Sequence, residues 1–239
     1  AGVTLYDYGP KGRTPRQTKR STIALKDAIL PWIAFEQPEF TRVLTWLKEQ
    51  VITETKGVFN DITATVDGFT FVFGLGGIHG SVESKIIESD DECVVVDLDV
   101  SSYYPNLAIT NRFYPAHLGA SFCDIYKHLY EQRKTYAKNS AENAMLKLAL
   151  NGVYGDSNNQ FSVFYDPMFT MSITLNGQLL LCLLAEGLMH IEGLKLIQIN
   201  TDGLTVLVPR ANKWMVDAVR ATWEARTKLQ LEEAIYSRM

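Results

Sequence analysis

The spacing of apolar side chains in the first hundred residues predicts two helical segments, a hairpin and a buried strand. Residues 23–29 and 39–52 are predicted to be helical, the second because apolar residues recur at helical spacing: Phe40, Val43, Leu44, Leu47 and Val51. Apolar and polar residues alternate over 58–73 around Asp67-Gly68, a dipeptide typical of tight turns, which predicts a β-hairpin. Residues 93–98 are apolar on both faces and predict a buried central strand.

The second half of the chain is predicted to contain mostly helices. Residues 122–137 and 140–154 have helical patterns separated only by Lys138-Asn139, so they should pack as an antiparallel pair. Asn139 and Glu142 resemble a capping box for the second of these helices. A very apolar helix is predicted over 170–190. A last helix is predicted over 211–228, with one apolar side: Trp214, Val216, Val219 and Trp223.

Residues 194–208 complete the pattern as a strand, a turn at Asp202-Gly203 and a second strand. Strands and helices therefore mix along the chain without regular alternation. This order predicts an α+β fold in which helices cover one face of an antiparallel sheet.

Composition excludes several classes of protein. The 239 residues are 46% hydrophobic and 21% charged, with a net charge of −4, which excludes disordered and fibrous chains and a strongly basic overall field. The three cysteines form no C-x-x-C pair, so neither a zinc ribbon nor a disulfide scaffold is expected, and a reduced, cytosolic setting fits best. Apolar runs are too short to predict a membrane span, and the first residues lack the order of a signal peptide.

Residues 1–20 are locally basic. They carry five cations against one acid, Asp7: Lys11, Arg13, Arg16, Lys19 and Arg20. This composition, with two prolines, predicts an extended arm. Two interpretations stay open, a solvated loop and a segment lying against a phosphate backbone.

Two acidic segments follow predicted strands. Asp99 lies at the end of the buried strand, and Asp202 lies beside the later tight turn. Each acid alone is typical of a turn or a cap. Together they could meet at one sheet edge, where paired carboxylates hold the metal ions of phosphoryl transfer.

A third segment combines a lysine, an amide and an aromatic ring on one helical face. Lys147, Asn151 and Tyr154 stand at positions i, i+4 and i+7. Such a face suits a triphosphate and a base or sugar, although a solvent-facing stripe has the same spacing.

These three segments, in this order, resemble the motifs of family B (polymerase-alpha-like) DNA polymerases. In the motif D-x-x-S-L-Y-P the matching residues are Asp99, Ser102, Tyr104 and Pro105, with Tyr103 replacing leucine. In K-x-x-x-N-S-x-Y-G they are Lys147, Asn151, Tyr154 and Gly155, with Gly152 replacing serine. In Y-x-D-T-D-S they are Thr201 and Asp202, while Gln198, Asn200 and Gly203 depart. The Gly-rich residues 73–80 and the run to Asp166-Pro167 resemble the bacteriophage branch.

The resemblance implies a role for each matched residue. Asp99, Asp202 and the Val100 carbonyl would hold two Mg²⁺ ions, with Mn²⁺ as a substitute. Tyr104 would exclude a 2′-hydroxyl and, with Ser102 and Tyr103, lie at the nucleotide. The other implied nucleotide contacts are Lys147, Asn151, Tyr154, Arg133 and Lys138. Residues implied to contact DNA are Gly76, Gly77, His79 and Gly155; for the glycine loop a plain turn is the alternative.

The resemblance also implies an organisation. Residues 1–80 would be an N-terminal arm and pre-palm region, 81–121 and 156–239 the two parts of the palm, and 122–155 two-helix fingers. The thumb and the exonuclease domain are expected to be absent, because few residues follow Gly203 and no well-placed D-x-E precedes the palm. The expected chain is therefore a catalytic centre cut from a larger polymerase or dependent on further domains or a partner chain.

The expected reaction is addition of dNTPs to a primer on template DNA, in the cytoplasm, or the host cytoplasm if the source is viral. Asn200 stands where the family has a second acid, so it is expected to support the site with activity retained. Asp97 either replaces part of the missing charge or is a simple strand-end acid. The rival interpretations are a non-catalytic remnant that grips primer–template, a two-metal nuclease and a reverse transcriptase.

Overall fold

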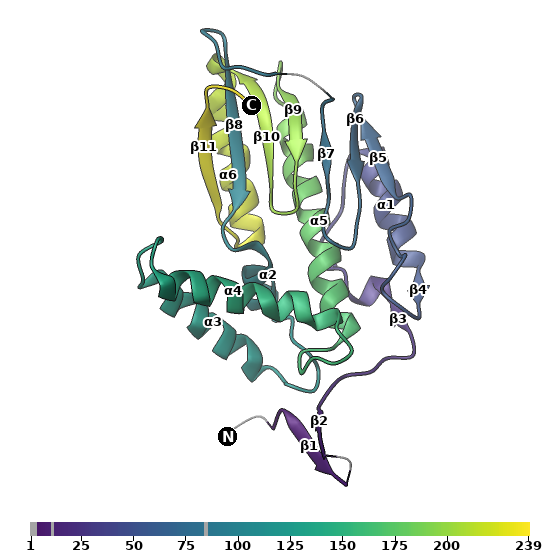
Figure 1. Cartoon of the computed structure of the whole chain (residues 1–239). Coiled ribbons are helices and arrows are strands. Elements are labelled where there is room, and N and C mark those ends of the chain that lie inside the picture. Colours follow the sequence, from purple (N-terminus) through teal and green to yellow (C-terminus); the bar gives the residue numbers. More distant parts are fainter. Residues whose placement is uncertain (1–3, 11, 84–85) are drawn as a thin grey trace.

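A five-stranded antiparallel sheet forms the centre of the structure (Figure 1), in the order β11-β8-β10-β9-β7. The computed structural model describes residues 4–10, 12–83 and 86–239. The strands are β7 (Gly80–Ser81), β8 (Cys93–Val100), β9 (Lys195–Ile199), β10 (Gly203–Pro209) and β11 (Leu231–Tyr236). Helices α5 (Pro167–Met189) and α6 (Lys213–Thr227) lie together on one face of this sheet (Figure 1). The predicted α+β class is confirmed.

Strand β8 is central, as its apolar run predicts. Val94, Val95, Val96 and Leu98 are buried, and β8 pairs with β10 on one side and β11 on the other. Because side chains alternate along a strand, the next residue after Leu98 is placed on the face opposite α5 and α6. Asp99 is there, exposed on the open face at the end of the strand.

Helix α5 is the core of the layer behind the sheet. Its 23 residues are long and apolar enough to cross a membrane by length and composition, unlike the shorter runs expected from the sequence. However, 89% of its most apolar window is buried inside the protein. Burial against the sheet and α6 accounts for this apolar character, as in a core helix.

The helices α3 (Ser121–Lys134) and α4 (Ala141–Gly155) lie side by side below the sheet (Figure 1), as their patterns predict. They follow α2 (Tyr103–Asn111), and the short helix η2 (Asp156–Asn158) continues from α4. The predicted cap at Asn139 is wrong. Ser140 is the N-cap residue, because its extended backbone lets its side chain accept a hydrogen bond from the Asn143 amide at 3.2 Å.

The N-terminal segment forms more strand than the sequence predicts. Residues expected to be an extended arm contain a hairpin, β1 (Tyr6–Gly9) and β2 (Gly12–Pro15); Lys11 lies outside the described residues. The Arg13 guanidinium lies 3.7 Å from the Tyr6 ring centroid, and Arg16 pairs with Asp7 at 2.7 Å. These cross-strand contacts explain why the basic residues fold back on themselves.

The predicted helix over 23–29 is also wrong. That segment is a short strand, β3 (Ile23–Ala24), followed by η1 (Leu25–Asp27), because it pairs with β4 (Val51–Ile52). Helix α1 (Pro38–Glu49) is therefore shorter than predicted. The hairpin β5 (Thr63–Val66) and β6 (Phe69–Val72) turns at Asp67-Gly68 as predicted, with φ values of 50° and 80°.

The chain after β10 differs in two respects from prediction. Helix α6 is preceded by η3 (Arg210–Asn212), and Trp214 is 65% exposed rather than on the buried side with Val216 and Trp223. Strand β11 was not predicted, although it pairs with β8 along its whole length. The second difference changes which residues lie near the end of β8, because β11 runs beside it.

Candidate functional site

The structure brings Asp99 and Asp202 together at one end of the sheet. Gly203 is directly opposite Asp99 in the β8–β10 register, and the Val100 amide donates to the Asp202 carbonyl at 2.7 Å. The turn before β10 is closed by the backbone N–H of Asn200, which donates to the Gly203 carbonyl at 2.8 Å. A Cβ at Gly203 would lie 2.5 Å from the Leu98 carbonyl oxygen and 3.2 Å from an Asp99 carboxylate oxygen. Glycine is thus what permits this close approach.

The acids at this edge repel one another. Partial burial raises the pKa of Asp99 to about 6, helped by the charges of Asp202, Asp97 and Glu232 and opposed by Lys147. The neighbouring acids destabilise the negative charge of Asp99, and a cation bound among them would offset this repulsion. This end of the sheet is therefore suited to bind a cation.

Two further acids flank Asp99, and each has a hydrogen-bond partner. An Asp97 oxygen accepts from the Thr205 hydroxyl at 2.6 Å, so Asp97 is tied to β10. Glu232 is opposite Asp99 on β11 and accepts from the Ser101 hydroxyl at 2.7 Å. This hydrogen bond, with Lys138 and Arg133 nearby, lowers the pKa of Glu232. Glu232 keeps negative charge beside Asp99.

Glu232 was missed by sequence reasoning. Residues 231–236 show no regular alternation of apolar and polar positions, and only the pairing of β11 with β8 identifies Glu232 as a neighbour of Asp99. Asn200, at the position where an acid was expected, accepts from the Gln198 amide at 3.0 Å and contributes no charge. The charge at this edge thus comes from β8, β11 and the turn before β10.

Two tyrosines form the wall beside the carboxylates. The rings of Tyr104 and Tyr154 have centroids 4.3 Å apart at an interplanar angle of 44°. The Tyr104 hydroxyl donates to the Gly76 carbonyl at 3.1 Å, and the Tyr154 hydroxyl lies 3.3 Å from the Leu75 carbonyl and 2.7 Å from the Thr174 hydroxyl. Burial raises the pKa of both phenols, so both rings are neutral.

Tyr103 has a different position from Tyr104. Its side chain is buried, and its hydroxyl donates to the Gly177 carbonyl at 2.6 Å. The ring therefore supports α2 against α5, and the Tyr103 side chain does not face the open edge.

The glycine-rich loop after β6 packs directly on this wall. Gly77 has a φ of +128°, and a Cβ there would lie 2.7 Å from the Thr201 methyl carbon. The Gly74 amide donates to the Gln178 side chain at 2.9 Å. His79 is exposed and bridges to Val72 through its backbone. The loop therefore contacts both tyrosines and the Asp202 turn.

Basic and polar side chains of α3 and α4 complete the surroundings. Lys147 and Asn151 are exposed on α4, and Gly155 ends this helix. Arg133 donates to the Asn143 side chain at 3.2 Å and to the Ser102 hydroxyl at 3.0 Å. Lys138 is 88% exposed and lies 3.6 Å from Glu232. These contacts connect the helical pair to the carboxylate edge.

The residue types at this end of the sheet suit a metal ion, but the described residues form no ready-made metal-binding cluster. Among the described residues no group of three His, Cys, Asp or Glu side chains is already gathered around a point. The expected ligands, which are the carboxylates of Asp99 and Asp202 and the Val100 carbonyl, are oxygen donors of the kind that suits hard cations such as Mg²⁺, which retain water and substrate ligands. The residues present therefore fit the expected ion.

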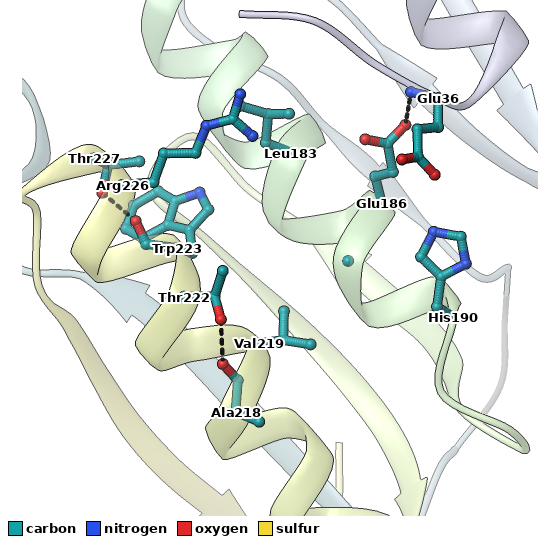
Figure 2. A pocket seen from close by; sticks show the side chains of 11 residues that line it. Glu36, Leu183, Glu186, His190, Ala218, Val219, Thr222, Trp223, Arg226 and Thr227 are labelled. Atoms are coloured by element: carbon teal, nitrogen blue, oxygen red, sulfur yellow. Dashed lines mark hydrogen bonds between the residues drawn. The ribbon is translucent and has the colours of Figure 1, made fainter.

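A separate cavity of about 400 Å³ lies between α5 and α6 (Figure 2). In this cavity Glu186 accepts hydrogen bonds from the backbone amides of Glu36 and Gln37, at the start of α1. None of the candidate site residues lines it. The cavity is thus distinct from the carboxylate edge.

The comparisons with known proteins find similarity at the level of structure. The sequence matches no family model and no curated protein. A structural neighbour is the family B DNA polymerase from the hyperthermophilic archaeon Pyrobaculum calidifontis, with a TM-score of 0.46 and 20% identity. The match covers 66% of this chain and 26% of that polymerase. At this level the likeness assigns no activity.

Proposed function

We propose that this chain is the catalytic centre of a template-directed DNA polymerase that adds dNTPs to a primer 3′-hydroxyl. The observation that supports this most is the meeting of Asp99 and Asp202 beside the Tyr104–Tyr154 wall and the exposed Lys147 and Asn151. A nuclease needs two metal-binding acids but not a grip for a triphosphate. The face of α4 therefore favours polymerisation.

In the proposed site, Asp99, Asp202 and the Val100 carbonyl would hold two Mg²⁺ ions. Bound there, the ions would lower the pKa of the primer hydroxyl and stabilise charge on the phosphates. The primer oxygen forms a bond to the α-phosphorus, the bond to pyrophosphate breaks, and the hydroxyl proton leaves to solvent or a nearby base. The residues of the chain contribute position and charge.

The remaining proposed roles follow the position of each side chain. Lys147 and Asn151 bind the triphosphate. Arg133, near the end of α3, and Lys138, in the loop before α4, assist them, while Ser102 holds Arg133. Tyr104 lies under the sugar and excludes a 2′-hydroxyl, and Tyr154 lies at the nascent base pair. Asn200 and Thr201 support the Asp202 turn.

This function implies the proposed organisation into an arm and pre-palm region (1–80), palm (81–121 and 156–239) and fingers (122–155). It also implies template DNA and dNTPs as partners, a cytoplasmic setting, and a relation to the bacteriophage branch of family B. These are expectations of the proposal.

The test compares primer extension by three purified proteins. Asp99→Ala removes a proposed metal ligand, and Asp91→Ala removes an exposed acid at the opposite end of β8. The wild type and Asp91→Ala should extend a primer in Mg²⁺, and Asp99→Ala should not. Extension by Asp99→Ala at the wild-type rate would rule out the proposed site.

The second candidate is a non-catalytic module that grips primer–template. Asn200 favours it, because the turn has one charge fewer than the motif it resembles. Primer–template binding without extension in Mg²⁺ or Mn²⁺ would identify this alternative.

A further inference from the structure

A second surface with the chemistry of nucleic-acid binding lies away from the carboxylates. It is a groove of about 1150 Å³ between the segment that follows β2 and the loop of residues 159–165. Its lining includes three cations and two aromatic rings: Arg16, Lys19, Arg20, Phe161 and Tyr165. Below it is called the arm groove.

The walls of the arm groove are fixed to each other. The Gln17 side chain donates to the backbone carbonyls of residues 160 and 162 at 2.7 and 2.8 Å, and the Thr18 amide donates to the Tyr165 carbonyl at 3.0 Å. Arg20 forms two hydrogen bonds to Asp166, whose side chain is buried. The arm is thus held in place before any ligand binds, which lowers the ordering cost of binding.

Some groups in the arm groove serve the fold, and others face solvent. Arg20 is engaged by the buried Asp166, so it is structural. Lys19 is exposed and forms no ion pair within the part of the chain that the structure describes. Arg16 pairs with Asp7, but both side chains are about half exposed, and such a pair is weak enough for a phosphate to compete.

Phe161 supplies a surface for stacking. Its side chain is 79% exposed at the tip of the loop, and its amide donates to the Asn159 side chain at 3.0 Å, which fixes the backbone there. A large exposed aromatic beside cations is the pairing that binds single strands, where bases stack and phosphates meet lysine and arginine. A duplex hides its base faces, so this pairing selects against one.

The arm groove is connected through the chain to α4, which carries the proposed nucleotide contacts. Its loop wall follows α4 and η2, and the Ser157 hydroxyl donates to the Tyr154 carbonyl at 2.7 Å. If the chain is the proposed polymerase, the single strand available to it is the unpaired template, and this selects the template as the occupant.

We infer that the arm groove binds single-stranded nucleic acid, namely the unpaired template strand ahead of the proposed polymerase site. Lys19 and Arg16 contact phosphates, and Phe161 stacks on a base. The choice of the template strand rests on the proposed function, whereas single-strand binding itself does not.

The experiment measures binding of a fluorescein-labelled oligo(dT) of twelve nucleotides to the full chain by fluorescence anisotropy. The test variants are Lys19→Ala, Phe161→Ala and the two combined. The matched control combines Lys195→Ala and Trp214→Ala, an exposed lysine and an exposed aromatic on β9 and α6. All four sites are exposed, and thermal melting of each variant confirms that it is folded.

The combined test variant should bind oligo(dT) at least about tenfold more weakly than wild type, because one stacked base alone is worth about fivefold or more. Lys19→Ala should also reduce the slope of log K against log salt by about 0.7. The control should stay within about twofold of wild type. A primer–template with a 5′ overhang should bind more tightly than its blunt counterpart, and the combined variant should remove that difference.

Unchanged oligo(dT) binding by the combined variant would overturn the inference. An equal loss of blunt-duplex binding by the combined variant would also overturn it, because the surface would then be a general phosphate-binding patch. If wild type does not bind oligo(dT) at all, the inference fails and a protein partner is left as the occupant. Failure of the proposed polymerase is distinguishable from these. A wild-type chain that never extends a primer but binds oligo(dT) through Lys19 and Phe161 supports the arm groove and refutes only catalysis.

Discussion

Replacing Asp99 by asparagine is expected to stabilise the metal-free protein at neutral pH while it removes catalysis. The pKa of Asp99 is raised to about 6 by burial and by Asp202, Asp97 and Glu232. The folded chain therefore binds this proton more tightly than the unfolded chain does. The stability linked to the proton is fully present below about pH 4 and is lost as pH rises through about 6.

The size of the effect follows from the shift. A rise of about two pKa units corresponds to about 3 kcal/mol. Because Asp99 is exposed on the open face, solvent screening reduces this, and we expect Asp99→Asn to gain about 1 kcal/mol at pH 8. For a chain of this size that is a melting temperature higher by about 2–4 °C.

The assay is urea denaturation in EDTA at pH 8, repeated downwards to the lowest pH at which the protein stays folded. Asp99→Asn should be more stable than wild type at pH 8, and the difference should shrink as the pH falls below 6. Asp91→Asn, at the other end of β8, should change stability little. Added Mg²⁺ should stabilise wild type and not Asp99→Asn. A variant as stable as wild type, or less stable, at pH 8 would refute the proposed repulsion at this edge.

Three further predictions test the glycine loop, the lysine on α4 and the tyrosine wall. Gly77→Ala should destabilise the fold by about 1–3 kcal/mol in urea titrations, because its Cβ would meet Thr201 at 2.7 Å and its φ is +128°; no loss of stability would contradict this. Lys147→Ala should raise the KM for dNTP about tenfold or more in steady-state extension, since it loses a charged phosphate contact, and an unchanged KM would exclude that role. Tyr104→Val should increase ribonucleotide incorporation relative to deoxyribonucleotide, measured as the ratio of kcat/KM values; an unchanged ratio would argue against a steric gate.

Local signals in the sequence predict those elements whose causes are local. The Asp67-Gly68 hairpin forms because both turn residues adopt positive φ, a property of those residues themselves. The α3–α4 pair follows from two helical patterns separated by a short polar link, and α5 follows from a long, very apolar segment. The convergence of Asp99 and Asp202 could also be expected, because each acid adjoins a strand end.

Two of the elements that were missed, β3 and β11, depend on distant partners. Residues 23–24 form a strand only because residues 51–52 pair with them, and β11 has an edge to join only because β8 is present. For the same reason Glu232 could not be placed beside Asp99. The contact between Gly77 and Thr201 joins positions 124 residues apart (201 − 77), and no local pattern carries it.

The most direct test of the central claim is single-nucleotide extension of a labelled primer on a template, with each dNTP supplied separately in Mg²⁺. The account predicts that the wild-type chain lengthens the primer by one nucleotide, only with the dNTP complementary to the template base, and that Asp99→Asn and Asp202→Asn give no product. Binding of the primer–template with no extension by wild type, in Mg²⁺ or Mn²⁺, would contradict it.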